Sequence, residues 1–129
     1  MEHALVDHAL AALLVPYAHA AGLHGSTAFN LGDGPTDFRV PDGGYHRGAP
    51  TGTWVPDAAI VVEIVSPDDE TYAKFGFYAA HGVEEIIVAD PTEKRIRCFR
   101  RTGTTYSESE KCDLLGVYAS DLTSEIDWP

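Results

Sequence analysis

The sequence predicts an α/β fold in which a mixed β-sheet is flanked by helices, and two observations carry this prediction. Residues 58–89 have the pattern of a buried strand, a helix and a second buried strand, which is a βαβ unit with parallel strands. The segments on either side carry turn residues at hairpin spacing, which predicts antiparallel neighbours. A sheet that contains both kinds of pairing is mixed.

Length and composition predict one globular domain over residues 1–129. A content of 44% hydrophobic and 22% charged residues excludes a disordered chain. The longest apolar stretches fall far short of the roughly 20 residues that a membrane span needs. No Lys or Arg precedes Arg39, so the basic start of a secretory signal is missing and a cytoplasmic location is expected. Cys98 and Cys112 lack zinc-site spacing and are interpreted as ordinary thiols.

The first half of the chain predicts one helix and two strands. Residues 2–21 form the helix, which Pro16 should kink or split, and its apolar face is expected to hold Leu5, Ala9, Ala12, Leu13 and Pro16. Strands are predicted at residues 26–31 and 36–40, joined by the turn at 32–35. A turn at residues 41–44 and an exposed loop to residue 52, which contains His46, should follow.

The second half predicts the central βαβ unit and then a hairpin. Residues 58–65 are apolar at nearly every position, as in a strand covered on both faces. Ser66-Pro67-Asp68-Asp69 should begin a helix that Gly82 ends. Residues 84–89 form the next buried strand. Residues 95–101 and 104–109 should pair through the turn at 102–103. Residues 114–118 are expected to form a last short strand.

Glu63 is the acidic residue inside the predicted central strand. Side chains alternate along a strand, so Glu63 shares one face with Val61 and Val65. An unpaired buried carboxylate is costly, and it must be protonated, be paired or bind a metal ion. Glu63 is therefore a candidate metal ligand. The alternative is a structural Glu that is bonded to backbone amides or to an arginine such as Arg39.

Asp42 and Lys74 are the other candidate site residues. Asp42 follows a predicted strand, and two carboxylates with open coordination positions suit Mg²⁺ or Mn²⁺. Such an ion can activate water for attack on a phosphodiester. Lys74 lies on the predicted helix and could reach back over Glu63 to hold a phosphate. The structural alternatives are an Asp42 bonded within its own turn and a Lys74 paired with Glu70, four residues earlier.

The charge distribution leaves two readings of the predicted hairpin open. The net charge of −11 counts against a chain that coats nucleic acid non-specifically. The cations gather, however, and five of the nine are Lys94, Arg95, Arg97, Arg100 and Arg101. They could line a nucleic-acid cleft, or they could form a solvated face that keeps the protein soluble.

Two segments carry a resemblance to a known family. VPDAAIVVEIVSPDD at residues 55–69 and KFGFYAAHGVEEIIVADP at 74–91 resemble the Uma-two family of putative restriction endonucleases, within the PD-(D/E)XK nuclease superfamily. The resemblance runs from about His3 to Val117. Its most specific part is residues 61–91, where EIVSP, K-x-x-x-Y, GV and ADP keep the order and spacing of the family.

This resemblance implies a restriction-endonuclease-like fold and a metal site made of Asp42, Glu63 and Lys74. The usual lysine of the superfamily lies two residues after the Glu, where this chain has Val65, so Lys74 is its implied substitute. The chain is also N-terminally short relative to the family, and an edge of the sheet is expected to be missing or supplied by a partner. Gly43 and Gly44 replace apolar residues and are expected to loosen the backbone beside Asp42.

Three functions follow as hypotheses. The first is a magnesium-dependent endonuclease that hydrolyses DNA, in which Asp42 and Glu63 bind the ion and Lys74 orients the attacking water or holds the phosphate. The second is a catalytically degenerate module that acts by binding or by self-association as a homodimer through an exposed strand. The third is a hydrolase for a small phosphorylated metabolite, which suits the negative charge better than DNA does.

Overall fold

The structure is a computed structural model that describes residues 1–67 and 70–129. The first half contains the helix α1 (Glu2–Ala20) and the strands β1 (His24–Thr27), β2 (Asn30–Gly34), β3 (Asp37–Arg39), β4 (Gly43–His46) and β5 (Trp54–Val55). The second half contains β6 (Ile60–Ile64), the 3₁₀ turn η1 (Tyr72–Lys74), α2 (Phe75–Ala80), β7 (Glu85–Asp90), β8 (Arg95–Thr102), β9 (Thr105–Ser109), β10 (Lys111–Cys112), β11 (Val117–Tyr118) and α3 (Ala119–Glu125).

The main sheet is mixed, as the sequence predicts. Among the described residues its strand order is β1-β4-β6-β7-β8-β9. Strands β6 and β7 are parallel and belong to the βαβ unit, whereas every other neighbouring pair in this sheet is antiparallel. Two small sheets, β3-β2-β5 and β10-β11, lie outside it. The prediction of an α/β fold with a mixed sheet flanked by helices is therefore confirmed.

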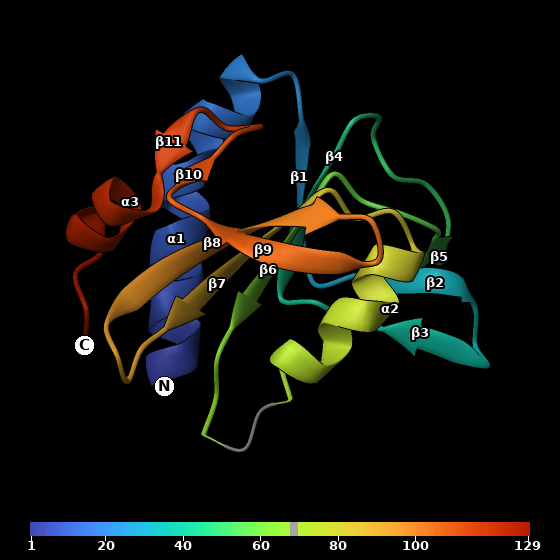
Figure 1. Cartoon of the computed structure of the whole chain (residues 1–129), viewed down its shortest axis with the longest axis horizontal. Coiled ribbons are helices and arrows are strands. Elements are labelled where there is room, and N and C mark those ends of the chain that lie inside the picture. The colour runs from blue at the N-terminus through green and yellow to red at the C-terminus, as the bar shows by residue number, and fades with distance from the viewer. Residues whose placement is uncertain (68–69) are drawn as a thin grey trace.

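Helices cover both faces of the main sheet (Figure 1). α1 runs behind the strands in that view, and α2 lies in front of them. Ile60, Val62 and Ile64 of β6 face α1 and belong to the larger core cluster. The alternate residue Val61 packs with Tyr78 of α2 in the second cluster. This alternation along one strand is why β6 is apolar at nearly every position.

Helix α1 differs from its prediction in two respects. It continues through Pro16 to Ala20, so the predicted split is wrong. Its buried residues are Val6, Leu10, Leu14 and Ala18, a different face from the predicted one. The helix carries apolar residues all round, so the spacing of those residues alone could not identify the face that meets the sheet.

The segment after Asp42 is a strand, and the predicted loop there is wrong. Gly43–His46 pairs with β1 on one side and β6 on the other. His46 is buried, and its Nε2 lies 2.9 Å from Ser26 Oγ. The glycines do not loosen the backbone. A Cβ at Gly44 would lie 2.5 Å from Cε1 of Phe29, so the missing side chain makes room for that ring.

The C-terminal third confirms the hairpin and adds two features. β8 and β9 pair in antiparallel register around Gly103, which has a positive φ of 71°. Helix α3 was not expected from the sequence. The interpretation of Cys98 and Cys112 as free thiols is wrong, because a disulfide joins them. The predicted helix start at residues 66–69 includes Asp68 and Asp69, which lie outside the described residues.

No helix in the described parts of the chain is long and apolar enough to cross a membrane. The cytoplasmic location stays a prediction.

Candidate active site

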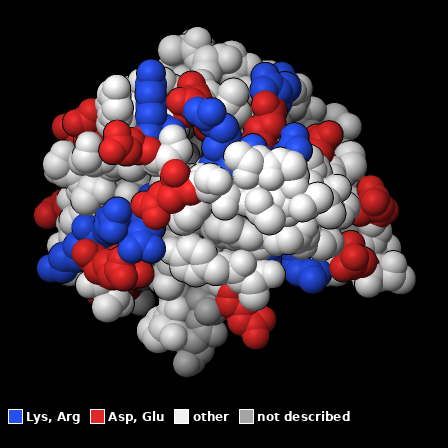
Figure 2. Space-filling model, in the orientation of Figure 1, with Lys and Arg blue, Asp and Glu red and all other residues white. Residues whose placement is uncertain are grey.

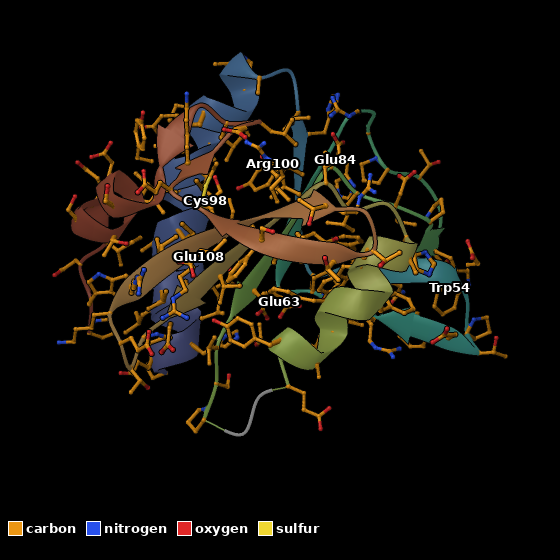
Figure 3. All side chains as sticks on the ribbon, in the orientation of Figure 1. Trp54, Glu63, Glu84, Cys98, Arg100 and Glu108 are labelled. Carbon is orange, nitrogen blue, oxygen red and sulfur yellow. A yellow bond between two sulfur atoms is a disulfide. The ribbon has the colours of Figure 1, made fainter. Side chains whose placement is uncertain are left out.

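Glu63 lies one residue before the end of β6, on the face of the sheet that α2 covers. Figure 3 shows it between the ribbon of β6 and that helix. Only 1% of Glu63 is exposed, and it shares its face of the sheet with the apolar cluster around Val61 and Val88. The pKa of Glu63 is raised to about 7, mainly by burial and to a smaller degree by the nearby carboxylate of Asp42. The carboxyl group is thus held near its titration point at neutral pH.

Two side chains from the segment after β6 reach back to Glu63. The hydroxyl of Tyr78 donates a short hydrogen bond to Oε1, and Tyr78 is itself fully buried. Nζ of Lys74 lies 3.5 Å from Oε1 and 3.4 Å from Oε2. Both contacts favour the ionised carboxylate and lower the pKa of Glu63, in opposition to its burial. Among the described contacts, Glu63 bonds to Tyr78 and Lys74 and not to Arg39 or to backbone amides. Lys74 pairs with Glu63, and no described contact joins it to Glu70.

Asp42 lies directly before β4. The register of β4 on β6 pairs Gly43 with Val62, so Asp42 comes next to Glu63 across the two strands. Its Oδ2 accepts a hydrogen bond of 2.8 Å from the backbone N–H of Ile64. Asp42 therefore bonds to the neighbouring strand β6. The structural alternative, in which Asp42 bonds to the backbone of its own turn, is not what the structure shows. The structure brings the three predicted residues Asp42, Glu63 and Lys74 to one edge of the sheet.

The first turns of α1 contribute two more groups to this edge. Nε2 of His3 lies 3.3 Å from Oδ1 of Asp42. Asp7, one helical turn later, is partly buried, and both this burial and the charge of Asp42 raise its pKa. Asp7 and Asp42 also line a pocket of about 250 Å³ between α1, β1 and β4. The acidic edge therefore extends from β6 to the start of α1.

The donor atoms of this site fit a hard divalent cation. Asp42 and Glu63 offer carboxylate oxygens, each with lone pairs beyond those used in the contacts above. Two carboxylates suit Mg²⁺, which keeps several waters, and the raised pKa of Glu63 is what a neighbouring cation would offset. No cluster of three or more His, Cys, Asp or Glu in the described part of the chain is arranged around one point. Waters and substrate would have to complete the coordination.

Three arginines of β8 are paired with acids, and Arg101 of the same strand donates to the backbone oxygen of Gly103. Arg95 contacts Glu108 at 3.3 Å, Arg97 contacts Glu93 at 3.2 Å, and Arg100 contacts Asp113. Figure 2 shows Lys and Arg side chains interspersed with Asp and Glu on this face of the molecule. Of the two readings that the sequence left open, this arrangement favours the solvated face over a continuous phosphate-binding surface.

Sequence reasoning missed three residues at this edge. Tyr78 carried a usable signal, because it follows Lys74 by four residues and so lies on the same face of a helix. His3 and Asp7 carried none, since their contact with Asp42 depends on how α1 packs against strands far along the chain. His46, which the sequence placed in an exposed loop, lies in β4, and its Nε2 is 2.9 Å from Ser26 Oγ.

Comparisons with known proteins identify a family and a shared fold. The Uma2 family model, described as "Putative restriction endonuclease", matches residues 1–124. A crystal structure from Anabaena variabilis, described as a "putative nuclease belonging to DUF820", superposes with a TM-score of 0.69 at 15% identity. The superposition covers 97% of this chain and 82% of that one, and it shows the same fold. No curated protein matches the sequence.

Proposed function

The chain belongs to the Uma2 family, and from that premise we propose that it is a metal-dependent endonuclease that hydrolyses DNA phosphodiester bonds. The observation that carries the proposal is the convergence of two carboxylates, Asp42 and Glu63, and the ammonium group of Lys74 at one edge of the sheet. Restriction-endonuclease-like families generally depend on divalent metals, and the oxygen donors of this site suit Mg²⁺ or Mn²⁺.

Each side chain has a distinct part in this proposal. Asp42 and Glu63 would hold the ion through carboxylate oxygens, and the ion when bound would supply an activated water and offset charge on the phosphodiester. Ile64 N–H fixes one oxygen of Asp42, and the Tyr78 hydroxyl fixes one oxygen of Glu63. Lys74 holds a phosphate oxygen or orients the attacking water, because its ammonium group lies beside Glu63 and remains a quarter exposed.

The proposal is tested by calorimetric titration of Mg²⁺ and Mn²⁺ together with nicking of supercoiled plasmid. Wild type is expected to bind the ion saturably and to nick DNA, and Glu63→Gln is expected to lose both. The matched control is Glu84→Gln, which changes the same group on a residue that pairs with Arg47 away from the site. Absence of metal binding and of cleavage in folded wild type would refute the proposal.

A second candidate function is self-association, and the outer face of α1 favours it. Leu5 and Val15 are 51% and 60% exposed. Residues 8–32 contain no Lys, Arg, Asp or Glu, although the whole chain carries a charge of −11. A second copy would meet less like-charge repulsion on this face than on the acidic parts of the surface. Light scattering on wild type and Val15→Lys tests the idea, since a homodimer through α1 should dissociate in the variant.

A further inference from the structure

An aromatic cluster lies on the α2 face of the sheet beside the candidate site. It consists of Tyr72 and Phe75 from the start of the helical segment, Phe99 from β8 and Tyr106 from β9. Ring centroids of contacting pairs are 5.1 to 6.0 Å apart, in tilted or edge-to-face geometry. Phe75, Phe99 and Tyr106 are partly buried, whereas Tyr72 is 47% exposed. Tyr72 thus presents an aromatic ring to solvent on a rigid aromatic base.

The register of the sheet sets the distance from this cluster to Glu63. Glu63 pairs with Val88 across β6 and β7, and Val88 pairs with Arg97 across β7 and β8. The three side chains therefore lie in one row on one face, and two interstrand steps separate Glu63 from Arg97 by roughly 10 Å. Arg97 and the hydroxyl of Tyr72 are close enough for that hydroxyl to raise the pKa of Arg97. Tyr72 lies two residues before Lys74, so the turn η1 carries both the exposed ring and the candidate site residue Lys74.

Arg97 can exchange its acidic partner Glu93 for another anion with little loss of stability. Its partner Glu93 is half exposed, and exposed ion pairs contribute less than about 1 kcal/mol. Its Nε is buried and makes no hydrogen bond to any described residue. Figure 2 shows a broad charge-free area over α2, bordered by both basic and acidic side chains. An exposed aromatic ring and a nearby cation are features that proteins use to hold unpaired nucleotides.

Electrostatics alone cannot supply the affinity for a nucleic acid here. The chain carries −11, and the other hairpin arginines with acidic partners are already neutralised. Stacking of a base on an aromatic ring does not depend on charge and contributes about 1–3 kcal/mol per base. In an intact duplex both faces of each base are covered by neighbours, so only an unstacked base can use such a ring.

We propose that Tyr72 and Arg97 form a subsite for one unstacked nucleotide, with the base on the Tyr72 ring and its phosphate on Arg97, next to the phosphodiester at Glu63. The preferred substrate is therefore single-stranded DNA or a duplex with an unpaired base at the cut. This inference rests on the proposed function, because it needs a DNA strand at Glu63.

The test compares the binding of one short oligonucleotide as a single strand and as a duplex, by fluorescence anisotropy with Ca²⁺. Tyr72→Ala is expected to weaken single-strand binding about tenfold, and Tyr72→Phe, which keeps the ring, is expected to bind like wild type. The control is Tyr118→Ala, because Tyr118 is 50% exposed beside Lys111 but lies on β11. A 2-aminopurine base in the strand should be quenched by wild type and Tyr72→Phe only.

A second pair of variants tests Arg97 without touching the ring. Glu93→Gln frees Arg97 and is expected to tighten single-strand binding several-fold. Glu84→Gln makes the same charge change beside Arg47 and should leave binding unchanged. Melting curves of all variants are expected to agree with wild type, because the exchanged side chains are exposed or half exposed.

The outcomes separate this inference from the proposed function. Equal single-strand binding by wild type and Tyr72→Ala would overturn the subsite, even if wild type nicks plasmid with Mg²⁺. Ring-dependent binding without any Mg²⁺-dependent cleavage would support the subsite and refute the nuclease. Wild type that binds duplex as tightly as single strand, or that binds neither, would overturn the subsite.

Discussion

Glu63 combines deep burial with three polar neighbours, and its titration follows from their balance. Burial raises the pKa of Glu63 more than Tyr78 and Lys74 lower it, so the net value is about 7 against an ordinary 4.5. Such displaced pKa values are typical of catalytic carboxylates and of metal ligands. In the metal-free protein, burial of this carboxylate lowers the free energy of unfolding at neutral pH.

Glu63→Gln is expected to stabilise the metal-free protein above neutral pH. Because the folded pKa exceeds the unfolded one, the folded chain binds more protons between pH 4.5 and 7, and its free energy of unfolding falls as pH rises through that window. The Gln variant lacks this loss, which is on the order of 3 kcal/mol. Urea unfolding at pH 5 and pH 8 measures the difference in free energy of unfolding between the variant and wild type. This difference should be smaller at pH 5 than at pH 8. The control Glu108→Gln, at the surface, should show no such change with pH.

Tyr78→Phe is expected to move the pH profile of cleavage to higher pH. The Tyr78 hydroxyl lowers the pKa of Glu63, so its removal raises that pKa and leaves less carboxylate at pH 7 to bind a metal. Activity should drop a few-fold at pH 7 and recover at pH 9. Tyr106→Phe is the control, since its hydroxyl donates to Val83 O and not to Glu63. A profile that keeps its midpoint in Tyr78→Phe would contradict this account.

The candidate residues could be found from sequence where the chemistry is local. Glu63 interrupts an apolar strand, and that interruption identifies it without any structure. Asp42 and Lys74 needed the family resemblance, because a turn acid and a surface ion pair explained each of them equally well. His3 could not be found at all, since its distance of 3.3 Å from Asp42 arises from the docking of α1.

At the scale of elements, β4 shows how packing outweighs local sequence signals. Gly43 and Gly44 are typical of a turn, yet they form a central strand between β1 and β6. The reason is steric, because the Phe29 ring occupies the space above Gly44. The βαβ unit and the hairpin were predictable because their apolar periodicity and turn residues agree. β4 and the buried face of α1 depend on contacts between distant segments.

Gly44→Ala is expected to destabilise the fold and to disturb Asp42. The added Cβ would lie 2.5 Å from the Phe29 ring and 3.2 Å from the backbone oxygen of Ile60, so the ring or the strand must move. Overpacking of this kind costs about 1–3 kcal/mol. Thermal unfolding measures the loss. Gly48→Ala has no heavy atom within 4 Å of the added Cβ and should unfold like wild type.

At the scale of the whole molecule, the negative charge limits how DNA can be held. Nine cations face twenty acids, and the arginines at positions 47, 95, 97 and 100 contact acidic side chains. A protein of this kind cannot wrap a duplex by neutralising many phosphates. Under the proposed function, DNA recognition would rest on a few contacts close to the cut.

The salt dependence of single-strand binding is therefore expected to be shallow. If only Lys74 and Arg97 contact phosphates, the slope of log K against log salt should be about −1.4, at roughly −0.7 for each contact. Titrations between 50 and 200 mM KCl, about a fourfold range, measure this slope. A slope of about −2.8 or steeper, which corresponds to roughly four phosphate contacts, would mean that Arg95 and Arg100 leave their acidic partners, and it would contradict the paired arrangement.

The row from Glu63 through Val88 to Arg97 has an evolutionary consequence. Backbone hydrogen bonds fix the positions of these three residues, so an exchange of the side chain at position 97 leaves the position of Glu63 unchanged. Under the proposed function and subsite, the choice of substrate and the chemistry of cleavage could then change independently. Relatives with this sheet could acquire new preferences through positions 72 and 97 alone, while Asp42 and Glu63 stay as they are.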